Sequence, residues 1–180
     1  QDLYFLTENL LENTPKAPKV SYLLEPKGRN TAPAIALAVR HIQKAHGDDA
    51  VCLVLAADHL ISDDAAFKRA VAQAEKQARA GSLVVFGVRP TAPETGYGYL
   101  EVAAAGNGPQ ALKSFDEKPN RATAEKYLAE GRYYWNSGMF CFTAGVMAEN
   151  MAAHASDVWE ASESTFAAAQ EEADVTRFEE

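Results

Sequence analysis

Residues able to do chemistry crowd together in residues 23–33, which read "LLEPKGRNTAP". Glu25 supplies a carboxylate, Lys27 and Arg29 supply cations, and Asn30 or Thr31 can begin a helix. Free backbone N–H groups at such a helix start attract polar or anionic ligands. A capped loop with solvated charges explains the same residues, and this stretch alone slightly favours that interpretation over a binding site.

A second group follows a buried apolar run in "LVLAADHLIS", residues 53–62. Asp58 can hold a hard cation such as Mg2+, which takes one or two protein carboxylates and keeps several waters. Alternatively, Asp58 caps a turn, and by itself this stretch favours the cap. His59 is interpreted as an orienting or packing residue rather than a ligand.

Three further stretches place polar or small residues where strands are expected. "GVRPTAPETGYGYLE" contains Gly98, which permits close approach of a ligand or simply a tight turn. "FDEKPN" contains Glu117 and Lys118, and "YYWNSGMFCF" sets Asn136 into an apolar strand. Burying a polar group within a strand costs free energy unless it is hydrogen-bonded. We therefore favour the interpretation that a ligand binds these groups.

These groups must be positioned by alternating strands and helices. Strands are predicted at 20–25, 51–57 and 82–88, with a helix carrying Ile35, Val39 and Ile42 after the first and a helix at 63–81 after the second. The unbroken apolar run 51–57 is typical of a strand buried on both faces of a parallel sheet. Shorter strands at 96–103, 111–118 and 133–142 follow, with a helix at 122–131 and a long acidic helix from about 146 to 170. The predicted fold class is α/β, with a mixed, mainly parallel sheet flanked by helices.

Composition excludes several classes of function. The chain has 180 residues, is 47% hydrophobic and carries a net charge of −8, without the basic stripe that nucleic-acid binding requires. It has no apolar run of about eighteen residues and no leader pattern, so we expect no membrane partner and a cytoplasmic location. Its two cysteines, Cys52 and Cys141, are predicted to be buried free thiols. A homo-oligomer is compatible with the sequence.

The motifs together resemble a known family. "LLEPKGRNTAPAIALA", "VLAADHLI", "GVRPTAPETGYGYLE", "FDEKP" and "YYWNSGMFCF", in this order and spacing, are similar to the core of the mannose-1-phosphate guanylyltransferases of the nucleotidyl-transferase family. These include the guanylyltransferase part of bifunctional enzymes with a phosphomannose isomerase domain. The resemblance covers residues 3 to 178 and implies a Rossmann-like nucleotidyl-transferase fold, with residues 1–180 as the central part of a single domain.

The resemblance also implies a reaction and its partners. Mannose 1-phosphate attacks the α-phosphorus of GTP, giving GDP-mannose and pyrophosphate, with Mg2+ as cofactor. It implies that Glu25 accepts hydrogen bonds from guanine and that Arg29, Asn30 and Thr31 frame the base. Asp58 matches a metal-binding aspartate. Sugar-phosphate binding falls to Gly98, Glu117, Lys118 and Asn136, of which Lys118 meets the phosphate.

Two departures from the family pattern accompany the resemblance. The family's glycine-rich loop before the first strand and a second metal-binding aspartate downstream are not found within residues 1–180. We therefore expect a fragment of a longer protein, incomplete at both ends and inactive alone. The alternatives are a non-catalytic regulatory subunit that binds sugar nucleotides, and a nucleotidyltransferase for another base or sugar 1-phosphate. Glu25 argues against thymine or uracil, which present a single N–H between two carbonyls.

Overall fold

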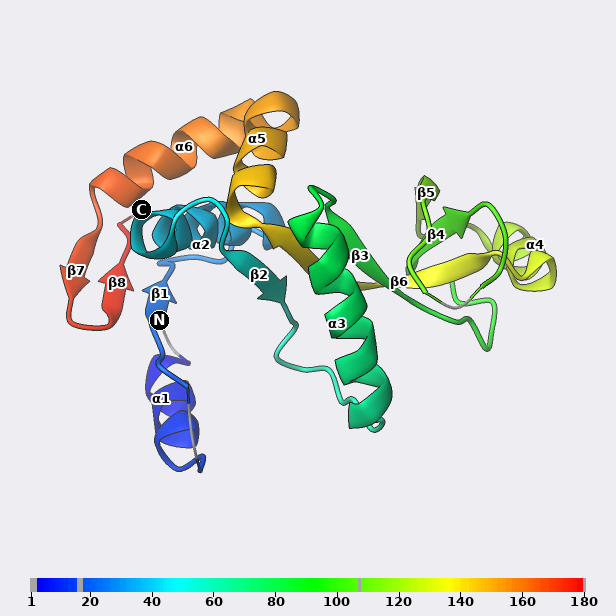
Figure 1. Ribbon diagram of the computed structural model, residues 1–180, viewed down its shortest axis with the longest axis horizontal. Helices are drawn as coiled ribbons and strands as arrows, with labels where there is room; N and C mark the ends of the chain where they lie inside the picture. Colours follow the sequence, from blue (N-terminus) through cyan, green and yellow to red (C-terminus); the bar gives the residue numbers. More distant parts are fainter. Residues whose placement is uncertain (1–2, 16–17, 107, 180) are drawn as a thin grey trace. The chain divides into compact units, whose positions relative to one another are not determined.

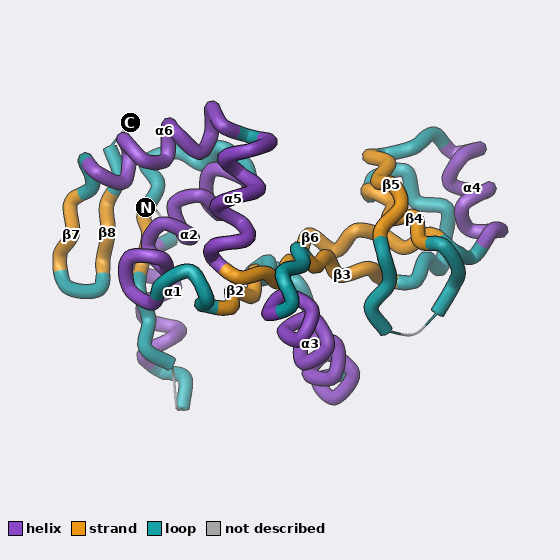
Figure 2. The backbone as a smooth tube through the Cα atoms, turned by 45° about the horizontal axis from the view of Figure 1, so that its top comes forward, coloured by secondary structure: helices purple, strands orange, loops and turns teal. Residues whose placement is uncertain are grey.

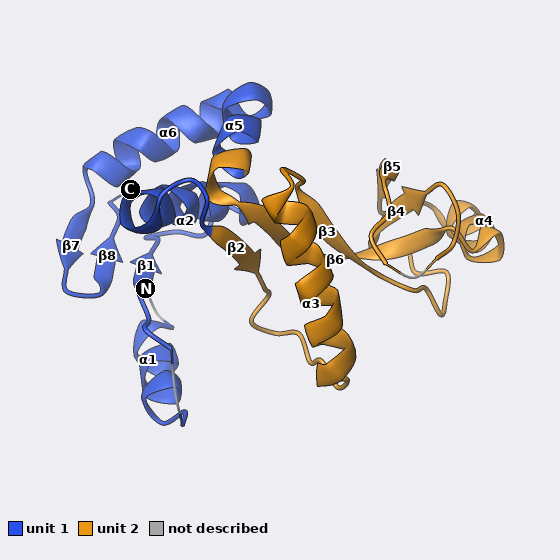
Figure 3. Cartoon of the chain, viewed as in Figure 1, with its two compact units in different colours: residues 1–50, 147–180 blue, residues 51–146 orange. Residues whose placement is uncertain are grey.

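The alternation of strands and helices predicted from the sequence is confirmed (Figure 1). The structure, a computed structural model, describes residues 3–15, 18–106 and 108–179. The chain forms two compact units, coloured separately in Figure 3. Unit 1 contains residues 1–50 and 147–180, and unit 2 contains residues 51–146. The expectation that the whole chain is the central part of one domain stays a prediction.

Unit 1 combines a small sheet with helices (Figure 2). The sheet has the order β1-β8-β7, in which β1 pairs with β8 in parallel and β7 pairs with β8 in antiparallel fashion. Buried side chains from β1, α2, α5 and the C-terminal segment form its core, among them Leu24, Ile35, Val39, Met147 and Phe178. The elements of unit 1 are α1 (Tyr4–Glu12), β1 (Tyr22–Leu24), α2 (Thr31–His46), most of α5 (Ala144–His154), α6 (Ser156–Ala167), β7 (Gln170–Glu172) and β8 (Val175–Arg177).

The long acidic helix predicted from about 146 to 170 is wrong, because α5 and α6 are separate helices. Ala155 breaks the run with an extended φ of −146° and a ψ of 49°. Its N–H still donates to the Met151 carbonyl, and its own carbonyl accepts from the Trp159 N–H. The break therefore leaves these backbone groups paired, and an alanine-rich sequence gives no local signal for it.

Unit 2 is built along one long strand, β6 (Tyr133–Thr143). On one edge of β6 lies β3, while β2 and β4 pair with the two ends of the other edge. The strand β5 extends the sheet beyond β4. The remaining elements of unit 2 are β2 (Val51–Val54), α3 (Asp64–Arg79), β3 (Val84–Val88), β4 (Gly98–Val102), β5 (Leu112–Glu117) and α4 (Arg121–Glu130).

The strand pairing corrects the expected mainly parallel sheet. The only parallel pair among the described residues joins β1 and β8, and every pairing within the sheet of unit 2 is antiparallel. Both β2 and β3 run antiparallel to β6, so they run in the same direction as each other, as a strand-helix-strand crossover requires. The sequence pattern predicts this crossover, but β6 lies between its two strands.

The strand β2 is less buried than its apolar sequence predicts. It spans four residues, and Leu53 and Leu55 are 37% and 48% exposed, so the prediction of burial on both faces is wrong for this run. The prediction of buried free thiols is confirmed for Cys52 and Cys141. Burial raises the pKa of the Cys52 thiol to about 11 and also raises that of Cys141, so both remain protonated at neutral pH.

In and beside helix α1, four large apolar side chains are exposed: Leu3, Phe5, Leu6 and Leu10. Among the described residues, no helix combines the length and apolar character needed to cross a bilayer.

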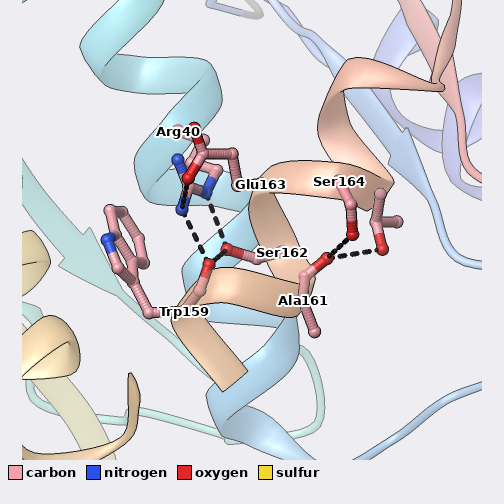
Figure 4. Close-up of polar contacts among 7 residues, drawn as sticks. Arg40, Trp159, Ala161, Ser162, Glu163 and Ser164 are labelled. Carbon is pink, nitrogen blue, oxygen red and sulfur yellow. Dashed lines mark hydrogen bonds and ion pairs between the residues drawn. The ribbon is translucent and has the colours of Figure 1, made fainter. Parts of the chain in front are cut away.

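A polar network joins α2 to α6 inside unit 1 (Figure 4). The Arg40 side chain is 15% exposed and donates from Nε to Ser162 Oγ at 2.7 Å and from Nη2 to the Trp159 carbonyl at 2.7 Å. Its guanidinium also lies 3.9 Å from the centroid of the Trp159 ring. Ser162 is buried and donates to the same Trp159 carbonyl. The network therefore fixes the position of α6 against α2.

We expect Ser162→Ala to lower the free energy of unfolding by about 1–3 kcal/mol, because it leaves a buried guanidinium N–H without its acceptor. Ser164 provides a matched control, since its exposed hydroxyl only donates to the Ala161 carbonyl one turn back on the same helix. Ser164→Ala should change the free energy by less than about 0.5 kcal/mol. Urea denaturation followed by circular dichroism measures both, and equal losses would contradict the role of the network.

Candidate functional sites

The junction between β1 and α2 opens onto a cavity of about 400 Å³ in unit 1. Glu25 follows the last residue of β1 directly and is half-buried, whereas Arg29, Asn30 and Thr31 are exposed. The cavity wall opposite the junction comes from α6 and the segment after β8. The lining residues of the junction are Glu25, Pro26, Lys27, Arg29, Pro33 and Leu37, and those opposite are Asp157, Val158, Ala161, Ser162, Thr165, Phe178 and Glu179.

The Glu25 carboxylate is one of the polar groups that line this cavity. Burial raises the pKa of Glu25 above its usual value. Within the described ranges, Glu25 has no hydrogen-bond or ion-pair partner, although Lys27 and Arg29 line the same cavity. A half-buried acceptor of this kind can receive N–H donors from a ligand.

Asn30 stands at the N-cap position of α2 but does not cap it. Its side chain makes no capping hydrogen bond, and its backbone has a φ of 69° and a ψ of −172°, a region that is almost reserved for glycine. Pro33 lies in the first turn of α2, as predicted. The first N–H groups of α2 therefore remain available beside the side chains of Asn30 and Thr31.

In unit 2, β6 leaves a gap on one edge at residues 136–139. On that edge β2 pairs with residues 140–143 and β4 pairs with residues 133–135, and the described pairings contain no partner strand between them. On the other edge, the register with β3 shifts between Val85 and Gly87. The carboxyl end of β2 and the start of β4 therefore both lie next to the polar segment in the middle of β6.

In this segment of β6, the side chains of Asn136 and Ser137 form hydrogen bonds with backbone groups. Asn136 Oδ1 accepts from the Gly138 N–H at 3.2 Å, Ser137 Oγ accepts from the Met139 N–H at 3.3 Å, and the Ser137 hydroxyl donates to the Phe86 carbonyl at 2.7 Å. Gly138 has a φ of 70°. This arrangement fixes the Asn136 amide oxygen, and among the described residues the NH₂ group of Asn136 has no hydrogen-bond partner. The prediction that Asn136 lies within a strand is confirmed.

The start of β4 and the end of β5 bring Gly98, Glu117 and Lys118 together. Gly98 pairs with Glu117 across the two strands, and a Cβ atom on Gly98 would lie 2.7 Å from Glu117 Oε2. Lys118 forms an ion pair with Glu117 at 3.2 Å and adopts a left-handed backbone with a φ of 51°. The absence of a side chain at Gly98 therefore lets the Glu117 carboxylate lie over the backbone, next to a cation.

Asp58 lies in a turn four residues after β2, rather than directly at the end of the strand as expected. It is exposed, and within the described ranges it has no hydrogen-bond partner, so no cap contact accounts for it. The described residues contain no group of three or more His, Cys, Asp or Glu residues that could hold a metal ion. A single free carboxylate still fits Mg2+, which binds through one or two carboxylates together with water and phosphate oxygens.

The structure thus groups the predicted residues into two sets. Glu25, Arg29, Asn30 and Thr31 lie in unit 1, and Asp58, Gly98, Glu117, Lys118 and Asn136 lie in unit 2. Sequence reasoning did not find the wall of α6 opposite Glu25, because no chemical motif marks it. Ser162 is buried within a helix of mostly exposed residues, and its contact with α2 becomes visible only in the fold.

Comparisons with known proteins show the family of the chain. The family model described as "Nucleotidyl transferase" matches residues 1–179. "Xanthan biosynthesis protein XanB" of Xanthomonas campestris pv. campestris (strain B100) is 50% identical over 157 residues, which are 87% of this chain and 33% of that protein. "Mannose-1-phosphate guanylyltransferase" of Escherichia coli (strain K12) is 46% identical over 167 residues, covering 88% of this chain and 34% of that protein.

A solved structure is similar over nearly the whole chain. The crystal structure of mannose-6-phosphate isomerase from Helicobacter pylori has a TM-score of 0.88 and 34% sequence identity, and it covers 98% of this chain and 68% of that one. The chain spans about a third of the length of the curated relatives it matches. The expected α/β nucleotidyl-transferase fold is confirmed, and the chain belongs to the nucleotidyl transferase family.

Proposed function

We propose that the complete gene product carrying this chain transfers GMP from GTP to mannose 1-phosphate, giving GDP-mannose and pyrophosphate. The observation that carries the proposal is the Glu25 carboxylate, which is half-buried in a cavity, has a raised pKa and has no partner among the described residues. Relatives that carry the name mannose-1-phosphate guanylyltransferase support it and favour catalysis over a regulatory subunit. The cytoplasm is the proposed compartment.

Glu25 and its neighbours read the nucleotide base in this proposal. Guanine presents two adjacent donors, N1–H and N2–H₂, and one carboxylate accepts both in a fork. Arg29 is exposed at the mouth of the same cavity, and Asn30 and Thr31 stand at the free N-terminus of α2. Only the ionised form of Glu25 accepts both donors, so binding of guanine favours the form that burial disfavours.

The groups of unit 2 hold mannose 1-phosphate in this proposal. The Glu117 carboxylate and the Asn136 amide hydrogen-bond sugar hydroxyls, and the Gly98 backbone lies close to the sugar. Lys118 is exposed and carries an ammonium group that can leave its ion pair to meet the phosphate. The sugar phosphate itself is the nucleophile in an in-line attack on the α-phosphorus, so these residues position and neutralise charge rather than form a covalent bond.

Asp58 is the proposed protein ligand for Mg2+ in unit 2. The ion, when bound, neutralises charge on phosphate oxygens. The role of Asp58 is to supply a carboxylate oxygen, and its exposed position in the turn after β2 leaves this oxygen free.

We expect Asp58→Asn to lower kcat of the complete gene product about 100-fold or more, because it removes the charge that would bind the ion while keeping the shape. Asp63→Asn is a matched control: Asp63 caps α3 by accepting from the Ala66 N–H, and asparagine caps equally well. Steady-state kinetics with GTP, mannose 1-phosphate and Mg2+ measures both variants. Equal kcat values for Asp58→Asn and the wild type would contradict a role in metal binding.

The choice of base is tested with Glu25→Gln, which places an amide donor against one guanine donor. We expect kcat/KM for GTP to fall roughly tenfold or more, a loss of about 1–3 kcal/mol. Inosine triphosphate lacks the N2 amine, so it should be a poorer substrate for the wild type and should lose less on mutation. Equal losses for GTP and inosine triphosphate would mean that Glu25 only shapes the junction.

The same variant should be more stable than the wild type at neutral pH. Because the pKa of Glu25 is raised in the folded state, the folded protein binds this proton more tightly than the unfolded chain. The resulting stability is fully present below the unfolded-state pKa and is lost as pH rises through the raised pKa. Glutamine resembles the protonated acid, so Glu25→Gln should keep this stability at pH 8, and its advantage in Tm should vanish at acidic pH.

Thermal unfolding measured between acidic pH and pH 8 tests this expectation. Glu172→Gln is the control, because Glu172 is an exposed glutamate of β7 in the same unit. It should leave Tm nearly unchanged throughout this range. A lower Tm for Glu25→Gln at pH 8 would show that the carboxylate stabilises the junction instead.

A further inference from the structure

A cluster of aromatic rings lies between α4 and the sheet of unit 2. The Tyr127 ring of α4 stacks on Tyr133 of β6 with centroids 3.8 Å apart, and it lies 5.4 Å from the ring of Tyr99 in β4. Tyr99 and Ala124 are fully buried in this cluster. These ring contacts fix the orientation of the Tyr127 ring, and the ring in turn sets the position of its hydroxyl group.

That hydroxyl reaches the end of β5. Tyr127 Oη donates to Asp116 Oδ2 at 2.8 Å. Burial, together with this hydrogen bond, raises the pKa of Tyr127 to about 12, so the hydroxyl keeps its proton and remains a donor. Asp116 immediately precedes Glu117 and Lys118, and neighbouring residues of a strand face opposite sides of the sheet. The contact therefore holds the strand from the side opposite to Glu117.

Other contacts fix the same turn beyond Asp116. The Lys118 N–H donates to the Tyr97 carbonyl at 3.3 Å, Pro119 is buried, and Asn120 caps α4 by accepting from the Thr123 N–H at 3.0 Å. Lys118 nevertheless has a left-handed backbone, which is unfavourable for a residue with a side chain. A turn in this conformation needs anchors on both sides, and Asp116 supplies the anchor on the strand side.

We propose that Tyr127 is a positioning residue, which acts through Asp116 to hold the Glu117–Lys118 turn in the conformation that binds the sugar phosphate. The identity of the ligand rests on the proposed function. The position of the turn does not, since it follows from the contacts of Tyr127, Asp116 and Lys118. In this proposal Tyr127 acts through its contact with Asp116 and the backbone of the turn rather than on the sugar phosphate itself.

The test compares Tyr127→Phe with Tyr133→Phe in the complete gene product. Both variants keep a ring in the stack, but the Tyr133 hydroxyl has no hydrogen-bond partner among the described residues. We expect Tyr127→Phe to raise KM for mannose 1-phosphate roughly five- to tenfold, as for loss of a hydrogen bond to a charged group, while KM for GTP stays unchanged. Tyr133→Phe should change neither KM. Unchanged values for Tyr127→Phe, or equal changes in both variants, would overturn the inference.

Two variants of Asp116 test whether the effect of Tyr127 depends on its hydrogen bond to this residue. Asp116→Asn keeps an oxygen that accepts from Tyr127, so its KM for mannose 1-phosphate should stay within about twofold of the wild type. Asp116→Ala should match Tyr127→Phe, and the double variant should be no worse than either single one. Additive losses in the double variant would mean that the two residues act separately, which contradicts the proposed route.

Hydrogen exchange separates this inference from the proposed function. The Lys118 N–H should exchange faster in Tyr127→Phe than in the wild type and Tyr133→Phe, whereas amides of β2 should be unaffected. This readout needs no substrate. If the wild type does not use mannose 1-phosphate, the proposed function fails and the exchange rate still decides the inference. Unchanged exchange at Lys118 would overturn it.

Discussion

Unit 2 depends on the long strand β6, whose pairing on one edge has a gap in the middle among the described residues. β6 joins β3 on one edge to β2 and β4 on the other, yet the part of the chain that the structure describes offers residues 136–139 no partner strand on the second edge. An interrupted strand normally exposes unpaired backbone groups, which are costly when buried. Asn136 and Ser137 supply the missing hydrogen bonds from their own side chains. These hydrogen bonds offset part of the cost of the gap, which leaves a polar segment between the ends of β2 and β4.

Unit 1 places the Glu25 carboxylate next to apolar side chains, and among the described residues this carboxylate has no hydrogen-bond or ion-pair partner. The raised pKa of Glu25 means that its charged form is disfavoured where it stands. The contacts of Arg40 with Ser162 and Trp159 offset such local costs, because they tie α2 to α6 with charge-assisted hydrogen bonds and ring contact. A cavity between packed helices can remain open only if its walls are fixed by contacts elsewhere, and this network lies beside it.

The sequence predicted the order and type of most elements, because hydrophobic periodicity and capping residues are local signals. Asp63 and Asn120 cap α3 and α4 as such signals require, and Gly131 ends α4 in a left-handed conformation. Strand pairing was predicted less well, since β6 comes from a segment about 80 residues beyond β2 and nothing local shows that it enters between β2 and β3. The break at Ala155 has no glycine or proline to mark it.

The candidate site residues could be proposed from the sequence by their chemical type. The residues that hold them in place could not. Glu25, Glu117 and Lys118 stand out in a sequence because charges at strand ends have no packing role. Tyr127 and Ser162 do not stand out, since a tyrosine or serine in an amphipathic helix reads as ordinary packing or surface. Their contacts join segments that are separated by 11 and 122 residues, and only the fold brings these partners together.

Two residues of the candidate sites adopt a backbone conformation that is less strained for glycine. Asn30 and Lys118 both have positive φ values, of 69° and 51°, where glycine would fold without strain. Elsewhere in the chain, Gly47, Gly81 and Gly131 occupy such positions at helix ends, and Ala173 has a φ of 53° in the turn between β7 and β8. A glycine at position 118 would keep the turn but lose the ammonium group beside Glu117, and at position 30 it would lose the amide at the start of α2. At both positions the strained residue carries a polar side chain that stands beside a carboxylate or a helix N-terminus, where glycine would supply no hydrogen-bonding group.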